Sequence, residues 1–89
     1  MVRYYVIFKG QVQGVGFRYT LYRLAVGLKI TGWVKNRSDG TVEAELQGKK
    51  SDILFLISNL QKNSYFIIID DYFMKEISLK EEEVSFRVR

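Results

Sequence analysis

Two segments in the first half of the chain carry residue types that could bind phosphate or hold water. The first, Gly10–Arg18, reads Gly-Gln-Val-Gln-Gly-Val-Gly-Phe-Arg and ends at the start of a predicted helix. Glycines let a backbone curl so that successive N–H groups point inward, and the unpaired N–H groups of a helix N-terminus add to them. The planar guanidinium of Arg18 could hold two phosphate oxygens. The spacing fits an anion cradle and, equally well, an ordinary glycine-rich connection with a surface arginine.

The second segment, Gly32–Glu43, places Asn36 at the end of a predicted strand, before a reversal at Ser38–Gly40. An asparagine amide donates and accepts hydrogen bonds but does not titrate in the usual range. Such a group could orient a water molecule without removing its proton. Taken alone, Asn36 is more simply interpreted as a turn residue, because asparagine is common in turns.

The composition excludes several kinds of catalysis. The 89 residues include no histidine and no cysteine, so an imidazole base, a cysteine nucleophile and a thiolate zinc site are all ruled out. This first suggests a binding module rather than an enzyme. Residues 1–50 hold nine basic and three acidic side chains, and residues 51–89 hold five and seven. A basic first half indicates an anionic partner, with an ordinary basic surface as the alternative.

Hydrophobic periodicity predicts the elements that position these segments. We expect strands over 3–10, 30–36, 42–46, 66–79 and 84–88, and helices over 17–28 and from an N-cap at Ser51 to residue 60. Gly27 is expected to help end the first helix. The order β-α-β-β-α-β, with a short extra C-terminal strand, predicts a ferredoxin-like α+β fold. We therefore expect one domain over residues 1–89, with an antiparallel sheet and both helices on one face.

The two segments together resemble the signatures of the acylphosphatase family, and the resemblance covers about the whole chain. Gly10–Arg18 is similar to Gly-x-Val-Gln-Gly-Val-x-Phe-Arg, and Gly32–Glu43 to Gly-Trp-Val-x-Asn-x-x-Asp-Gly-x-Val-Glu. The resemblance implies hydrolysis of the carboxyl–phosphate bond of acyl phosphates, releasing inorganic phosphate. It also implies that Arg18 binds the substrate phosphate and Asn36 positions the attacking water. The phosphate cradle would be the backbone of Gln13, Gly14, Val15, Gly16, Phe17 and Arg18.

The chain departs from the family pattern after the second helix. The family usually has a Gly-Pro pair there, whereas this chain reads Lys-Asn-Ser-Tyr-Phe over Lys62–Phe66 and contains no proline. The sequence therefore does not predict the path of the chain into the fourth strand. The two motifs do not include this segment and keep the family pattern.

Two other functions remain as alternatives. A related domain begins the hydrogenase-maturation carbamoyltransferases, which would make this chain an accessory module for carbamoyl phosphate or another anion. Those chains continue through zinc-finger segments, whereas this sequence ends at Arg89, which favours the small enzyme. RNA-recognition domains share the strand order but carry a Lys/Arg-Gly-aromatic motif in the third strand. Here Val42–Leu46 is acidic and lacks an aromatic residue. The rings of Tyr4, Tyr5, Phe8, Tyr19 and Tyr22 are predicted mostly to pack in the core.

The remaining expectations concern partners and location. We expect no metal and no cofactor, with the acidic runs Asp70-Asp71 and Lys80–Glu83 solvated rather than metal-binding. The apolar runs Ile53–Ile57 and Tyr65–Ile69 are far shorter than the roughly 20 residues that cross a bilayer. A cytoplasmic monomer that binds neither nucleic acid nor membrane is the simplest expectation.

Overall fold

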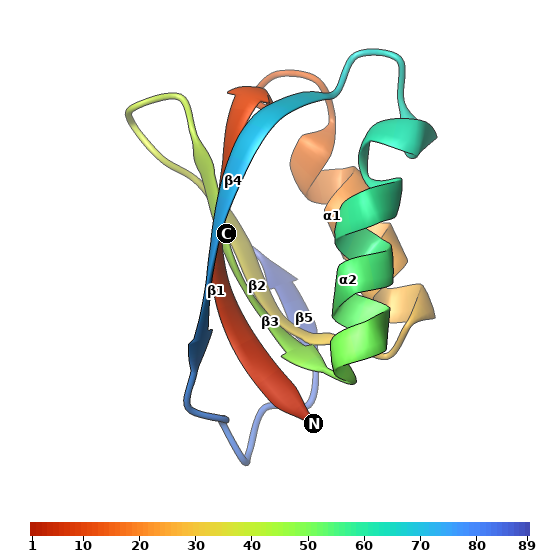
Figure 1. Ribbon diagram of the computed structural model, residues 1–89, viewed down its shortest axis with the longest axis vertical. Helices are drawn as coiled ribbons and strands as arrows, with labels where there is room; N and C mark the ends of the chain where they lie inside the picture. Colours follow the sequence, from red (N-terminus) through yellow and green to blue (C-terminus); the bar gives the residue numbers. More distant parts are fainter.

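The structure is a computed structural model that describes residues 1–89, the side chain of Asn63 excepted. Two helices cover one face of a five-stranded sheet (Figure 1). The elements are β1 (Val2–Gln11), α1 (Phe17–Gly27), β2 (Thr31–Asn36), β3 (Val42–Gly48), α2 (Lys50–Asn59), the 3-10 turn η1 (Gln61–Asn63), β4 (Ile68–Ile77) and β5 (Phe86–Val88). The predicted α+β order and the ferredoxin-like arrangement are confirmed.

The sheet has the strand order β4-β1-β3-β2-β5, with β3 in the middle. Neighbouring strands are antiparallel from β4 to β2, but β5 runs parallel to β2, with Gly32 opposite Phe86 and Val34 opposite Val88. The predicted antiparallel sheet is confirmed for β4, β1, β3 and β2, and the predicted extra C-terminal strand joins it in parallel. After β4 the chain crosses the end of the sheet at which β2 begins, so β5 enters from that end (Figure 1).

The core lies between the sheet and the helices. Alternate residues of β1, among them Val6 and Phe8, are fully buried on the helix side. The helices contribute apolar stripes at helical spacing, so that Leu21 of α1 and Leu56 of α2 are also fully buried. No helix among the described residues is long and apolar enough to span a membrane.

The helix ends differ from the prediction in two places. The N-cap of α2 is Lys49 rather than Ser51, because the N–H groups of Asp52 and Ile53 both bond to the Lys49 carbonyl. β3 leads into α2 almost without a loop, so the reversal of the chain fixes where the helix begins. After α1 the left-handed residue is Lys29, with φ of 58°, rather than Gly27.

On the sheet face away from the helices, Arg3 forms a buried polar cluster. Its side chain has no exposed surface, and its guanidinium donates hydrogen bonds to Glu45 (2.7 Å), Glu83 (2.7 and 3.2 Å) and Gln47 (3.2 Å). Burial lowers the pKa of Arg3, but the hydrogen bonds to Glu83 and Glu45 outweigh it and hold the pKa above its usual value. The cluster joins β1, β3 and the connection that precedes β5.

Candidate active site

The connection between β1 and α1 curls at two glycines with left-handed backbone angles. Gly14 has φ of +72° and Gly16, the N-cap of α1, has φ of +76°; open space lies where a side chain would extend from either. The first helical N–H bond of α1 is from Thr20 to the Gly16 carbonyl. The preceding N–H groups, from Phe17 to Tyr19, therefore have no acceptor within the helix. Such a helix start is suited to binding an anion.

Gln13 fixes this loop against the hairpin between β2 and β3. Its side-chain amide donates to the carbonyl oxygens of Arg37 (2.7 Å) and Thr41 (2.9 Å). Arg37 follows Asn36 in the chain, so these bonds set the distance between the loop and Asn36. The side chain of Gln13 thus holds the two sequence motifs together, a contact that the spacing of the motifs does not predict.

Asn36 lies at the end of β2, opposite Val42 of β3, and shares the helix-facing side of the sheet with Val34. Its Oδ1 atom is buried, and no described group donates a hydrogen bond to it. Buried polar atoms in proteins nearly always have a partner, which is either another protein group or an ordered water. An unsatisfied acceptor at this position is the feature expected of a group that holds a water molecule.

The loop, α1 and the ends of β2 and β5 enclose a pocket of about 460 Å³. Its lining brings the two predicted motifs together, since Arg18 and Asn36 both contribute to it. The residues that line it are Val12, Gly14, Gly16, Phe17, Arg18, Tyr19, Tyr22, Asn36 and Val88. Of the predicted loop residues, Gln13 and Val15 do not line it; Val15 packs against the core instead.

Arg18 is half-buried in the first turn of α1, and its guanidinium points toward β5. Nη1 donates a 2.9 Å hydrogen bond to the main-chain oxygen of Arg89, the last residue of the sequence, whose own N–H bonds to the Val34 carbonyl at 2.8 Å. A phosphate can accept two parallel hydrogen bonds from a guanidinium, whereas Arg89 accepts only one, so a bound phosphate could displace this single contact.

Two aromatic residues of the pocket were not predicted to lie there. Tyr19 and Tyr22 were predicted to pack mostly in the core, but they are 63% and 36% exposed. The spacing could have predicted the position of Tyr22, because Tyr22 lies four residues after Arg18 and therefore shares its face of the helix. Of the other predicted core rings, Tyr4 and Phe8 are buried and Tyr5 is half-buried.

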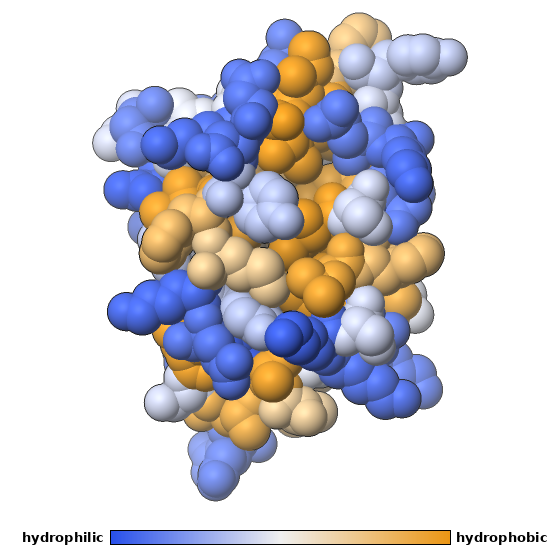
Figure 2. Space-filling model, in the orientation of Figure 1, coloured by the Kyte–Doolittle hydropathy of each residue, from blue (hydrophilic) through white to orange (hydrophobic). Residues whose placement is uncertain are grey.

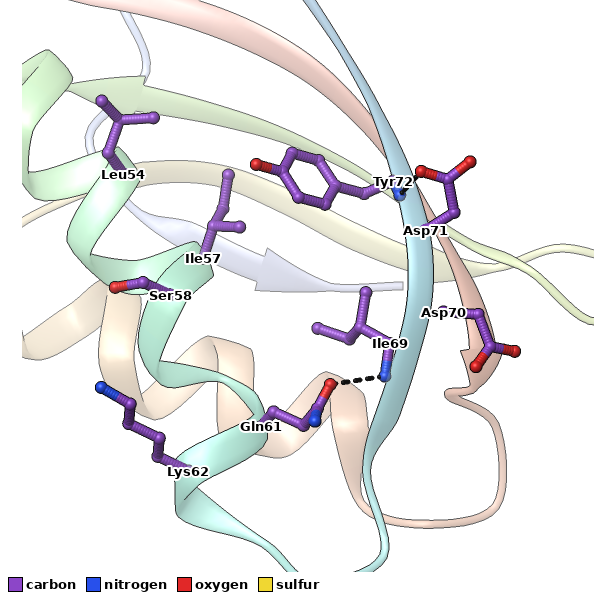
Figure 3. Close-up of a pocket in the computed structure, with 9 residues that line it drawn as sticks. All are labelled: Leu54, Ile57, Ser58, Gln61, Lys62, Ile69, Asp70, Asp71 and Tyr72. Atoms are coloured by element: carbon purple, nitrogen blue, oxygen red, sulfur yellow. Dashed lines mark hydrogen bonds between the residues drawn. The ribbon is translucent and has the colours of Figure 1, made fainter.

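A second hollow of similar size, about 480 Å³, lies between α2 and β4 and is differently lined. Ile69 and Tyr72 point from β4 toward α2, whereas Asp70 and Asp71 point away from the helix (Figure 3). Apolar residues gather along this side of the molecule, between more hydrophilic margins (Figure 2). The hollow contains no arginine in its lining, and its only cation is Lys62. Size alone therefore does not distinguish the two pockets, but their charge does.

Among the described residues, no group of three or more carboxylates is placed to hold a metal ion. The first pocket has instead a glycine loop, a helix N-terminus, one arginine and one asparagine. These groups are suited to holding an anion and a water molecule side by side.

Comparisons with known proteins agree with this chemistry. The profile of the acylphosphatase family matches residues 4–88. The acylphosphatase of Clostridium beijerinckii is 37% identical over 89 residues, covering 100% of this chain and 99% of the relative. The crystal structure of acylphosphatase from Bacillus subtilis superposes with a TM-score of 0.91 at 35% identity, covering 100% of this chain and 99% of the other. The chain therefore belongs to the acylphosphatase family of hydrolases.

One further structural relative is much longer than this chain. Full-length HypF, in a phosphate- and nucleotide-bound form, matches with a TM-score of 0.85 at 28% identity. The match covers 100% of this chain but only 12% of that protein.

Proposed function

We propose that this chain hydrolyses the carboxyl–phosphate bond of acyl phosphates in the pocket between the β1–α1 loop and Asn36. The observation that carries the proposal is the buried, unpartnered Oδ1 of Asn36 in the same pocket as Arg18 and the glycine loop. The family and its full-length relatives support the activity, and the geometry supports the roles proposed for these residues.

In this mechanism the substrate phosphate lies in the loop. The N–H groups from Gln13 to Arg18 and the guanidinium of Arg18 neutralise charge on its nonbridging oxygens. Asn36 accepts a hydrogen bond from a water molecule and holds it in line with the carboxylate that leaves. The bond from phosphorus to the acyl oxygen breaks as the bond from phosphorus to the water oxygen forms.

The leaving group explains why so few residues are required. A carboxylate is stable as an anion, so its departure needs no general acid. We assign the proton of the attacking water to a nonbridging oxygen of the substrate phosphate, which is released as inorganic phosphate. Since the chain has no histidine, no imidazole titration should shape the pH–rate profile between about pH 5 and 8.

The experiment that tests the proposal is phosphate release from benzoyl, acetyl and carbamoyl phosphate, with phosphate monoesters as controls. We expect hydrolysis of acyl phosphates and no hydrolysis of monoesters. Equal rates on both classes, or no release from any acyl phosphate, would contradict the proposal. The same assay with a chelator should show no change, and a loss restored by one added metal would refute the metal-free mechanism.

Substitution of Asn36 tests its role separately from binding. Asn36→Ala should lower kcat by about 10²-fold or more, because the water loses its acceptor while the phosphate keeps its cradle. A folded Asn36→Ala enzyme with near-normal kcat would exclude this role for the side chain.

The assay with carbamoyl phosphate tests the alternative that this chain is an accessory module that binds carbamoyl phosphate. Tight binding of carbamoyl phosphate without turnover, in a protein that also fails to hydrolyse the other acyl phosphates, would favour that alternative. An RNA-binding role is opposed by Glu43 and Glu45, which lie on the open face of the central strand.

A further inference from the structure

The lining of the pocket around Arg18 includes polar groups and apolar side chains. The loop glycines, Arg18 and Asn36 account for the polar groups. The rest of the lining consists of Val12, Phe17, Tyr19, Tyr22 and Val88, whose side chains have no part in the mechanism above. Tyr19 and Tyr22 come from α1, which packs on the helix-covered face of the sheet that carries Asn36 (Figure 1).

The ring of Tyr22 is held in a defined place. Its centroid lies 6.4 Å from that of Phe86, at an interplanar angle of 54°, and Phe86 is itself buried. Such tilted aromatic pairs are favourable contacts. Because Tyr22 follows Arg18 by one helical turn, its ring lies next to the guanidinium on the same face of α1.

Two neighbouring guanidinium groups lie on aromatic rings, and one of these rings belongs to the lining. The guanidinium of Arg23 lies over the ring of Tyr19, 5.8 Å from its centroid. That of Arg89 lies over Trp33 at 5.0 Å. Within the described lining, Arg18 is the single charged residue. An acyl group beside Tyr22 would meet rings and methyl groups, with Arg18 as the one charged side chain of the described lining.

The direction of the reaction sends the acyl group toward the aromatic side chains of α1. In an in-line displacement the leaving group departs on the side of phosphorus opposite the attacking water. Since Asn36 holds the water at the sheet, the acyl group departs away from the sheet, toward α1. We propose that Tyr22, with Tyr19 beside it, forms an acyl subsite that favours aromatic or bulky apolar acyl groups over acetyl and carbamoyl. This inference rests on the proposed function and adds its substrate class.

The test compares kcat/KM for benzoyl phosphate with that for acetyl phosphate in four proteins. The wild type should prefer benzoyl phosphate. Tyr22→Ala should lower the benzoyl-to-acetyl ratio by about 5- to 10-fold, the effect expected from losing one aromatic contact. The loss should lie in KM rather than kcat, because the ring contacts ground state and transition state alike. Tyr22→Phe keeps the ring and should keep the ratio.

The matched control is Tyr72→Ala. Tyr72 is 45% exposed, comparable to Tyr22, but lines the other hollow, so its loss should leave the ratio unchanged. If Tyr22→Ala does not fold, Tyr22→Leu carries the test, since it keeps apolar contact with Phe86 but removes the ring. An unchanged ratio in a variant that hydrolyses both substrates would overturn the acyl subsite alone. Failure of the wild type to hydrolyse either substrate would overturn the proposed function, and the subsite with it.

Discussion

Two arginines of this molecule have opposite surroundings. Arg3 lies fully buried on the open face of the sheet, where Glu45 and Glu83 accept its hydrogen bonds. Arg18 lies half-buried at the start of α1 and donates to one main-chain oxygen, that of Arg89 at the end of the sequence. No described side-chain carboxylate is within ion-pair distance of Arg18.

This difference separates a structural cation from one that is available to a ligand. A guanidinium already surrounded by carboxylates has its donors occupied and its charge neutralised, so it offers little to a phosphate. Arg18 instead stands beside unpaired N–H groups at a helix N-terminus, where a second anion-binding element reinforces it. The surroundings of each arginine, rather than the residue type, therefore indicate its role.

The largest expected effect comes from removing the available arginine. Arg18→Ala should lower kcat/KM for benzoyl phosphate by about 10²- to 10³-fold, because the phosphate loses its one side-chain cation. The midpoint of thermal unfolding, followed by circular dichroism, should change little.

Lys62→Ala is the control, since Lys62 is the only cation lining the other hollow. The kcat/KM of Lys62→Ala for benzoyl phosphate should match that of the wild type. Equal losses in the two variants would mean that overall positive charge, rather than the Arg18 site, supports catalysis.

The second effect is on stability and concerns the structural arginine. Arg3→Met should lower the free energy of unfolding by about 3–5 kcal/mol, because Glu45 and Glu83 would remain without their counter-ion. Urea unfolding measures this loss, and the folded fraction should retain its kcat. Adding Glu45→Gln and Glu83→Gln should restore part of the stability; no recovery would argue against an electrostatic origin.

A smaller effect is expected from a matched pair of glycines at the two ends of α1. Gly16→Ala forces a side chain into a left-handed conformation, which costs about 1–2 kcal/mol, and should lower activity about tenfold by distorting the loop. Gly27→Ala is within the helix with open space around it and should raise stability by about 0.5–1 kcal/mol. Identical activities in the two variants would mean that the loop conformation is unimportant.

The smallest effect is a pH dependence confined to the Arg3 cluster. Burial raises the pKa of Glu83, but hydrogen bonds from Arg3 and Thr31 outweigh it and lower the pKa below its usual value. The stabilisation is therefore present above the unfolded pKa of about 4.3 and is lost as the pH falls through the lowered, folded value. The free energy of unfolding, measured with urea between about pH 2 and 6, should rise less steeply with pH for Glu83→Gln than for the wild type. An equally steep rise would exclude Glu83 as the source of the pH dependence.

The sequence was most informative where structure depends on neighbouring residues. The glycine loop and the turn before Thr41 depend on local backbone chemistry, so their residue types predicted them. The Arg3 cluster was not predicted, because Arg3 and Glu83 are 80 residues apart and nothing local couples them. The parallel pairing of β5 escaped prediction for the same reason, since the chain crossing after β4 sets it. The N-cap at Lys49 is set instead by the tight reversal between β3 and α2.

Within the candidate site, motif spacing predicted the loop and Asn36 but not how they are joined. The Gln13 amide bonds across to the hairpin, and Tyr22 completes the pocket only because α1 packs beside β5. Both depend on the relative placement of elements, which hydrophobic periodicity does not specify.

The contact between Arg18 and Arg89 has a consequence for how the protein loses function on heating. It fastens the pocket to β5, a three-residue edge strand flanked by the Gly32–Ser85 and Arg89–Val34 hydrogen bonds. Short edge segments open locally at lower free energy than the core. Detachment of β5 would release Arg18 and remove Val88 from the pocket lining, while the four antiparallel strands stay paired. Inactivation should therefore begin below the melting temperature, with amide exchange at Arg89 as its earliest sign.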